Sequence, residues 1–252
     1  MATETTTLPA QLFRFSTGAV GPKEEVPDFP WDYAVPTTPF WNTFEHHKAR
    51  SFLVCFTSAE LSHFSLNEEI QYASAPQPEK LTVLHSLLQK KLQAEESKYP
   101  DDDSAAGFPK SDAQLWARLV MAISGIDQEL GRIEDAEHGL RVLVAGEPEN
   151  LVYAFNLAGF LVENTDKYEE ARGLAVQSRD WVDGRVGRAS PQGIGARKTV
   201  AMASWKMGEV ERAKGEIEEV WQCVGELKGT RFAVYEEEER EGVREWEASV
   251  GV

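Results

Sequence analysis

Cysteine and long apolar stretches are both scarce in this chain of 252 residues. The two cysteines, Cys55 and Cys223, are too few for a disulfide-held fold, and neither belongs to a CxxC pair. No run of about 18 apolar residues occurs, which argues against a membrane-spanning helix. The first residues, MATETTTLPAQ, hold neither the basic segment nor the apolar core of a secretory signal. We therefore expect a cytoplasmic protein, with the nucleus as the alternative.

Signatures of catalysis and metal binding are missing as well. The stretch Glu45–His47 puts two imidazoles about 100° apart on a helix, whereas the zinc motif HExxH places them on one face. Asp101–Asp103 lacks the glycine and the distal glutamate of a calcium loop. Gly193–Gly195 is a fragment of a dinucleotide fingerprint without a strand before it. The sequence therefore predicts no metal and no cofactor, and it favours a protein that is not an enzyme.

Positive charge is in short supply too. With 26 basic and 42 acidic residues the formal net charge is −16, so the overall field repels a phosphate backbone. We therefore expect no nucleic-acid partner. The same charge keeps an extended fold in solution.

Residues 1–36 predict an irregular arm, because five prolines interrupt any helix and no strand alternation is evident. The arm nevertheless carries large apolar side chains, each of which could gain about 1.5–3 kcal/mol by burial. We expect it to pack on the helical body as a hydrophobic strap. The alternative is that Trp31, Tyr33 and Trp41 fold into a ligand groove. The apolar residues concerned are Phe13, Phe15, Phe29, Trp31 and Tyr33.

Residues 37–110 predict helices that form either a degenerate repeat or a cap. Thr38 and Pro39 resemble a helix start, in a helix running to about residue 56. Thr57 and Glu60 form a candidate capping box for a second helix. After a break at Pro76, leucines with spacings of three, four and four predict a long amphipathic helix. A polar loop is expected over 99–109. The leucines are Leu81, Leu84, Leu88 and Leu92.

A sextet recurs in the second half of the chain, at 131–136, 166–171 and 208–213. Each copy joins two helix-like apolar stretches, which predicts helical hairpins over about 112–147, 151–183 and 196–226. Ser111 with Gln114 predicts a capping box at the start of the first. A last helix over about 230–249, apolar on one side and acidic on the other, suits the cap of a stacked array.

These copies resemble tetratricopeptide (TPR) repeats, which are helix–turn–helix units of about 34 residues. Each copy has a small residue where two antiparallel helices would cross: Ala136, Ala171 and Ala213. Gly131 and Gly208 stand at the turn, where a left-handed backbone can end the first helix. The resemblance implies an all-α fold: a right-handed solenoid of TPR-like hairpins over 111–252, with a C-terminal capping helix.

The resemblance also implies a binding surface, because the first helix of each TPR hairpin lines a concave groove. Aromatic, amide and cationic side chains there suit a partner peptide or a small ligand with an acidic end. The family's carboxylate clamp of lysine and asparagine is not reproduced, so chaperone binding is not expected. The register places these residues in the groove: Arg118, Met121, Tyr153, Asn156, Phe160, Lys198, Met202 and Trp205.

A second candidate site is a glycine- and arginine-rich stretch over 183–196, expected to be a mobile loop able to close over an anion. The alternative is a solvated insertion between repeats. Its candidate residues are Arg179, Arg185, Arg188 and Arg197.

The leading functional hypothesis is a module that binds a peptide segment of another protein. The first alternative is a small helical enzyme or ligand-binding protein whose pocket is closed by the arm. The second is a structural subunit of a larger assembly. The sequence indicates neither the partner nor the oligomeric state.

Overall fold

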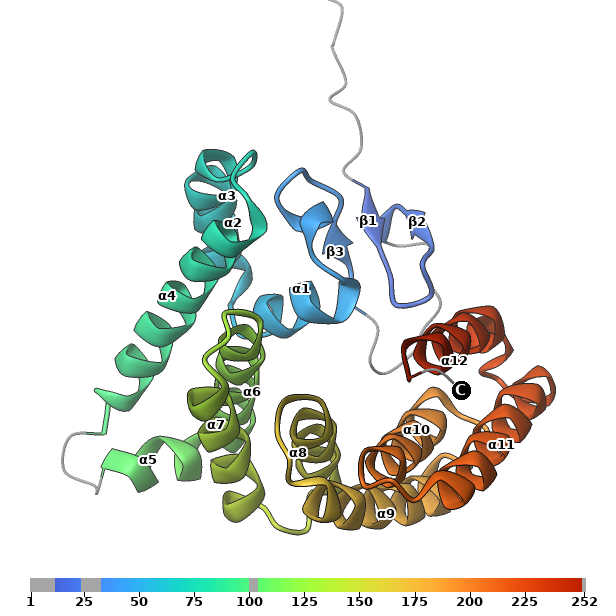
Figure 1. The fold of residues 1–252 in the computed structure, drawn as a ribbon. Coiled ribbons are helices and arrows are strands. Elements are labelled where there is room, and N and C mark those ends of the chain that lie inside the picture. The colour runs from blue at the N-terminus through green and yellow to red at the C-terminus, as the bar shows by residue number, and fades with distance from the viewer. Residues whose placement is uncertain (1–11, 24–32, 100–103, 251–252) are drawn as a thin grey trace, which may run out of the picture. The chain divides into compact units, whose positions relative to one another are not determined.

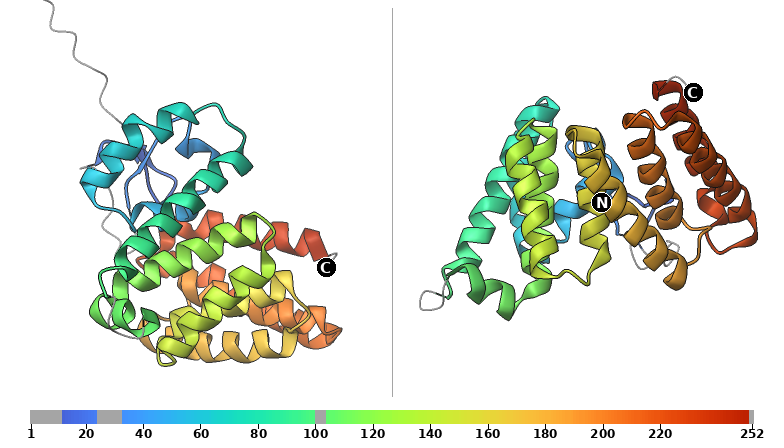
Figure 2. Two further views of the ribbon diagram at one scale, coloured as in Figure 1. Left: turned by 90° about the vertical axis from the view of Figure 1, so that its left-hand side faces the viewer. Right: turned by 60° about the horizontal axis from the view of Figure 1, so that its bottom comes forward.

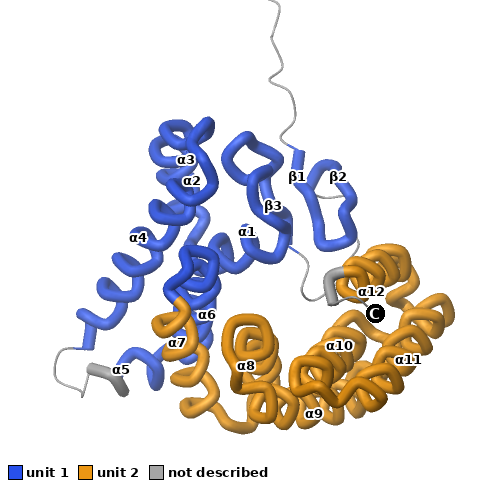
Figure 3. Tube along the Cα trace, in the orientation of Figure 1, with its two compact units in different colours: residues 1–132 blue, residues 133–252 orange. Residues whose placement is uncertain are grey.

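The computed structural model describes residues 12–23, 33–99 and 104–250 (Figure 1). The chain forms two compact units. Unit 1 comprises residues 1–132 and unit 2 comprises residues 133–252 (Figure 3). The boundary falls in the turn of the first predicted hairpin, so its two helices are described with different units. The division into arm, N-terminal helices and repeats stays a prediction.

Unit 1 combines three short strands with six helices among its described residues. The strands are β1 (Phe13–Arg14), β2 (Val20–Gly21) and β3 (Val35–Pro36). The helices are α1 (His46–Leu53), α2 (Ser58–Leu66), α3 (Glu68–Gln71), α4 (Gln77–Glu96), α5 (Ser104–Ser111) and α6 (Ala113–Glu129).

The N-terminal arm is more regular than predicted. β1 pairs antiparallel with both β2 and β3, which gives a small sheet of order β2-β1-β3. Its strands are two residues long, too short for alternation to show in the sequence. The guanidinium of Arg14 donates to the carbonyl oxygens of Trp41, at 2.8 Å, and Phe44. Phe15 and Val35 are buried, and Val35 belongs to the same core cluster as Trp41. That the arm as a whole packs on the body stays a prediction, and Phe29 and Trp31 lie outside the described residues.

The predicted helix from Thr38 is wrong in extent. A single 3-10 turn covers Trp41–Thr43, and Phe44 is extended, with φ −114° and ψ 148°, so α1 begins only at His46. The capping box of α2 is confirmed. The backbone N–H of Glu60 donates to Thr57 Oγ1 at 3.3 Å, and the backbone N–H of Thr57 donates to Glu60 Oε2 at 2.7 Å.

The leucine stripe of α4 is confirmed, because Leu81, Leu84 and Leu88 are buried. Two expectations after it are wrong. The polar loop over 99–109 contains α5, and the cap of α6 is Asp112 instead of Ser111. The Asp112 carboxylate accepts from the backbone N–H of Leu115 at 3.0 Å. Ser111 is the last residue of α5, so its backbone already belongs to a helix.

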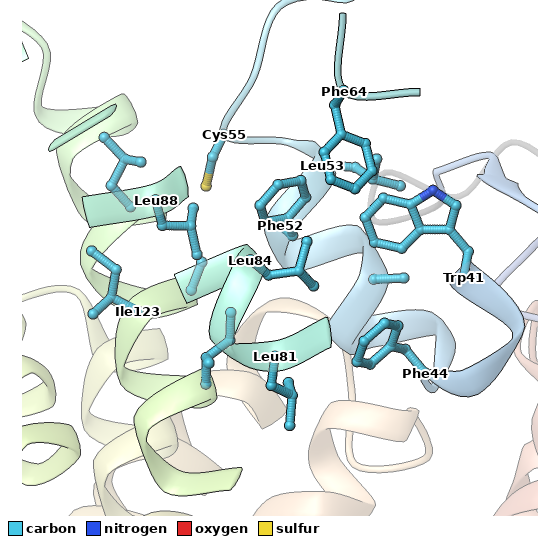
Figure 4. Packing of buried hydrophobic residues seen from close by; sticks show 14 of the residues in the cluster. Trp41, Phe44, Phe52, Leu53, Cys55, Phe64, Leu81, Leu84, Leu88 and Ile123 are labelled. Carbon is cyan, nitrogen blue, oxygen red and sulfur yellow. The ribbon is translucent and has the colours of Figure 1, made fainter. Parts of the chain in front are cut away.

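An aromatic cluster forms the core of unit 1. The Trp41 ring lies 5.6 Å from Phe52 and 5.5 Å from Phe64 between centroids, and Figure 4 shows the three rings together beside leucines of α4. α6 contributes Leu119 and Ile123 to the same cluster. Trp41 is therefore a core residue of unit 1, and the alternative that it folds into a ligand groove is wrong.

Unit 2 is built from successive antiparallel helices, each packed on the next (Figure 2). They are α7 (Ile133–Gly146), α8 (Leu151–Asn164), α9 (Tyr168–Arg185), α10 (Pro191–Lys206), α11 (Val210–Glu226) and α12 (Glu236–Val250). Phe232 and Tyr235 precede α12 and are buried, as are its Val243 and Trp246, so it covers the end of this stack.

The small residues and turn glycines behave as the repeats predict. Ala136, Ala171 and Ala213 are 0% exposed. Gly131 and Gly208 have φ of 73° and 77°, a region that glycine adopts without strain. The residue after each glycine donates a backbone hydrogen bond to the carbonyl five residues before it. After Gly208, for example, the N–H of Glu209 donates to the Ser204 carbonyl at 3.0 Å. The all-α fold of TPR-like helical hairpins is confirmed.

Ion pairs also join consecutive second helices of the hairpins. Arg141 on α7 donates two hydrogen bonds of 2.8 Å to Glu170 on α9, which lower the pKa of that carboxyl. Arg172 on α9 donates to Glu209, the residue before α11, at 2.6 Å. These pairs connect α7, α9 and α11 along one side of the stack. Because the pairs are partly exposed, each contributes about 0–1 kcal/mol to stability, and their main effect is to fix how these helices are aligned with one another.

The predicted glycine- and arginine-rich loop is much shorter than expected. α9 continues to Arg185, and α10 begins at Pro191 with Ser190 as its cap, which accepts from the backbone N–H of Gly193 at 3.1 Å. A Cβ on Gly193 would lie 2.6 Å from the Arg188 carbonyl oxygen. Gly193 therefore allows a close turn here, where the sequence had indicated a mobile loop.

Candidate functional site

The first helices of the second and third hairpins share one exposed side. α8 and α10 contact each other, and α9 packs against both from the other side. On α8 the least buried positions follow helical spacings of four, three and four. They are Val152, Asn156, Gly159 and Glu163, with Tyr153 beside them.

The matching positions on α10 are only partly buried and have spacings of three, four and three. They are Gly195, Lys198, Met202 and Trp205. A Cβ on Gly195 would lie 3.2 Å from the Phe155 ring, so the two helices approach closely here. The residues of these two stripes, with Tyr153, are called the α8–α10 face below.

Polar groups on the α8–α10 face differ in their contacts with the rest of unit 2. Asn156 is exposed, and its side-chain amide donates to the Val152 carbonyl of its own helix at 2.7 Å. Burial raises the pKa of Tyr153, and the charge of Glu147 adds to the shift. Lys198 Nζ lies 3.4 Å from the position of a Cβ on Gly242, so its ammonium group reaches α12.

Glu239 on α12 interacts electrostatically with this ammonium group. Burial raises the pKa of Glu239 from 4.5 to about 7; the Lys198 charge opposes the shift and the Glu238 charge adds to it. At neutral pH the ionised fraction of Glu239 therefore decides how far this carboxylate offsets the positive charge of Lys198.

Replacing Glu239 with glutamine is expected to raise the free energy of unfolding at about pH 8 by about 1–2 kcal/mol, after allowance for partial solvation. Since the folded state raises this pKa, the ionised form opposes folding, and the wild type loses stability between about pH 4.5 and 7. At about pH 4 the carboxyl is mostly protonated in both states, so the two proteins should differ little. Urea unfolding at both pH values measures this; equal stability at the higher pH would contradict it.

Three of the predicted groove residues do not belong to this face. Phe160 is 3% exposed and belongs to the core. Met202 belongs to the face, but it packs against Ala201, Ile217 and Trp246, so only part of its side chain is accessible. Arg118, which is exposed, and Met121, which is half-buried, lie on α6 in unit 1. Tyr153 and Asn156 lie on α8, and Lys198 and Trp205 lie on α10; Asn156 is exposed and the other three are partly buried.

The four arginines of the predicted anion site contact different groups. Arg179 pairs with the adjacent Asp180 at 2.8 Å, and Arg188 Nε lies 3.1 Å from Glu226. Arg185 stacks 4.5 Å above the Trp181 ring, beside an open hollow of about 510 Å³ that also holds Glu147 and Glu149. Carboxylates in this hollow disfavour an anion. Anion binding by these arginines stays a prediction.

Arg197, the fourth of them, is buried among carboxylates. Its guanidinium donates to Asp183 at 2.6 and 2.9 Å and to Glu219 at 2.7 Å. Burial alone would lower the pKa of Arg197, but these hydrogen bonds raise it above its ordinary value. Arg197 therefore ties α9, α10 and α11 together.

Unit 1 contains an apolar pocket that the sequence did not indicate. Its volume is about 410 Å³, within the range of about 300–1,000 Å³ for ligand sites. No lining residue comes from the described parts of the N-terminal arm, so this pocket is not one that those residues close. The lining residues are Phe52, Phe56, Ala59, Glu60, Leu61, His63, Phe64, Glu68 and Leu87.

Residues 12–23, 33–99 and 104–250 contain no group of three or more His, Cys, Asp and Glu side chains arranged to hold a metal ion. Every helix in those ranges is too short or too polar to cross a lipid bilayer.

The fold and its exposed face define a class: an all-α protein with TPR-like helical hairpins. No protein-family model and no curated protein matches the chain. Among solved structures, it is similar to TPR-like repeats of a kinesin light chain-like protein from Podosopora anserina (TM-score 0.41, 16% identity, 75% of this chain and 100% of that one). It is also similar to BtubC from P. vanneervenii (TM-score 0.45, 17% identity, 82% and 91%). These similarities are too weak to carry a functional argument.

Proposed function

We propose that this chain is a protein-interaction module that binds a peptide segment of a partner on the α8–α10 face. The supporting observation is the combination of exposed Asn156 with partly exposed Tyr153, Lys198 and Trp205 on two adjacent helices. Amides bind the backbone of an extended peptide, and aromatic rings supply apolar contact at little cost in side-chain entropy.

The partner segment should carry an acidic residue opposite Lys198. Glu239 already faces this ammonium group, so an acid of the partner would replace Glu239 as its neighbour. Since the pKa of Glu239 is about 7, mild acidification neutralises this competitor first. Binding should therefore be somewhat tighter at about pH 6 than at about pH 8, as long as the partner acid stays ionised.

The test compares partners recovered by the wild type with those recovered by the double variant Asn156→Ala plus Lys198→Ala. A matched control, Lys214→Ala plus Gln222→Ala, likewise removes one ammonium group and one side-chain amide, from exposed positions of α11. Quantitative mass spectrometry should show one set of proteins depleted by the face variant and kept by the control. If both variants recover the same proteins as the wild type, the α8–α10 face is not the binding site.

A further inference from the structure

The apolar pocket of unit 1 has rigid aromatic walls. The Phe52 ring lies 4.6 Å from Phe56 and 5.7 Å from Phe64 between centroids, and Leu87 on α4 contributes to the lining. Phe52 and Phe64 are buried, whereas Phe56 and Leu61 are half-exposed. The pocket is therefore an extension of the core that remains open to solvent.

The charged groups at this pocket are mainly acidic. Two carboxylates, Glu60 and Glu68, belong to its lining, which includes no lysine or arginine. Lys91 Nζ lies 2.5 Å from Glu60. Burial would raise the pKa of Glu60, but hydrogen bonds from Lys91 and Thr57 lower it, so this carboxylate is ionised and already paired. Glu68 supplies the remaining negative charge, in a chain whose net charge is −16.

Two large apolar side chains close to Glu68 in the sequence are exposed. Leu66 and Ile70 are 75% and 66% exposed, and they stand two residues before and two residues after Glu68. Large exposed apolar side chains are typical of protein-binding surfaces. A small ligand inside the pocket would leave both of these side chains in water.

We propose that this pocket, together with Leu66 and Ile70, is a docking site for an amphipathic segment of a partner protein that carries bulky apolar side chains flanked by lysine or arginine. The apolar side chains enter between Phe56, Leu61 and Leu87, and a basic side chain lies near Glu68. A fatty acid would fill the same volume, but its carboxylate would add a negative charge near Glu68, whose charge no lysine or arginine of the lining offsets, so charge favours the basic peptide.

This docking site is independent of the proposed function, because all of its residues belong to unit 1 and the α8–α10 face belongs to unit 2. Variants of one site can therefore be tested without altering the other.

The experiment is calorimetric titration of the full chain with three probes: an amphipathic helical peptide of Leu, Phe and Lys, the same peptide with Glu in place of Lys, and dodecanoate. Ala59→Trp fills the pocket from an exposed position on α2. Glu68→Lys reverses the charge at the pocket. Glu79→Lys makes the same change at an exposed position of α4 that does not line it. Circular dichroism confirms that each variant is folded.

The basic peptide should bind the wild type. Ala59→Trp should lower its affinity at least about tenfold, because an apolar anchor of the peptide then loses its pocket. Glu68→Lys should weaken it about threefold, the effect of a surface charge, while Glu79→Lys and the double variant Asn156→Ala plus Lys198→Ala should not. The acidic peptide should bind more weakly than the basic one. The proposal is overturned if Ala59→Trp leaves binding unchanged, if the acidic peptide binds as tightly, or if dodecanoate alone binds.

Discussion

Replacing Arg197 with alanine is expected to lower the free energy of unfolding by about 2–4 kcal/mol. Arg197 is 5% exposed, and its guanidinium is shared between Asp183 and Glu219. Without it, two carboxylates from α9 and α11 remain close together around α10 with no cation between them. The expected loss is below that of a fully buried pair, because both acids keep some contact with water. Urea unfolding followed by circular dichroism measures it.

The matched control is Arg212→Ala. Arg212 also contacts two carboxylates, Glu209 at 3.3 Å and Glu216 at 2.9 Å, but half of its side chain is exposed. Its removal should cost about 0–1 kcal/mol. Equal losses for the two variants would show that burial of Arg197 contributes nothing to the stability of unit 2.

Replacing Trp41 with alanine is expected to cost about 3–5 kcal/mol, the range for a large aromatic side chain removed from a core. Trp41 is 1% exposed and packs against Phe40, Phe52 and Phe64 at centroid distances of 5.0–5.6 Å. No neighbouring ring can fill the space without leaving its own contacts. Chemical unfolding monitored at wavelengths that report helix content gives the value for unit 1.

Trp41→Phe serves as the conservative comparison. It keeps one aromatic ring in the cluster and should lose less than half as much stability as Trp41→Ala. A loss below about 1 kcal/mol for Trp41→Ala would mean that the side chain is solvated and that the aromatic cluster is not the core of unit 1.

The helices of unit 2 were predictable because their signals are local. An alanine between apolar residues at helical spacing needs no distant partner to be recognised, and Ala136, Ala171 and Ala213 are all buried as expected. A turn glycine precedes Ala136 and Ala213. Capping signals were less decisive. Ser111 and Asp112 are both good N-cap residues, and only the presence of α5 before them decides for Asp112.

The arginine cluster shows where local reading fails. Glycines and arginines over 183–196 are typical of a solvated loop, yet Arg197 binds acids that lie 14 residues before it and 22 residues after it. Gly193 fits the close turn before α10, and Gly195 admits the Phe155 ring of α8. The roles of Arg197 and Gly195 depend on neighbours that are remote in sequence, whereas Gly193 meets Arg188 and Ser190 close by in the chain. The pocket of unit 1 likewise combines residues of α1, α2, α3 and α4.

Candidate binding residues were predictable only in part. The TPR register placed Tyr153, Asn156, Lys198 and Trp205 in a groove lined by first helices of hairpins; they lie on α8 and α10 and none of the four is in the core, but a shared groove stays a prediction. It also placed Phe160 in the groove. Phe160 follows Gly159 of the α8 stripe directly, so its ring points to another side of the helix, and it lies in the core. Lys198 was expected to be available to a ligand, and its proximity to Glu239 on α12 was not evident from the sequence.

The packing of α8 on α10 underlies both the repeat array and the proposed binding face, and nuclear Overhauser effects test it most directly. With phenylalanine and glycine selectively labelled, the Phe155 ring protons should give strong cross-peaks to the Gly195 Hα protons, since that ring lies 3.2 Å from where a Cβ would stand. Cross-peaks from Phe155 to other helices, with none to Gly195, would contradict this packing and remove the α8–α10 face.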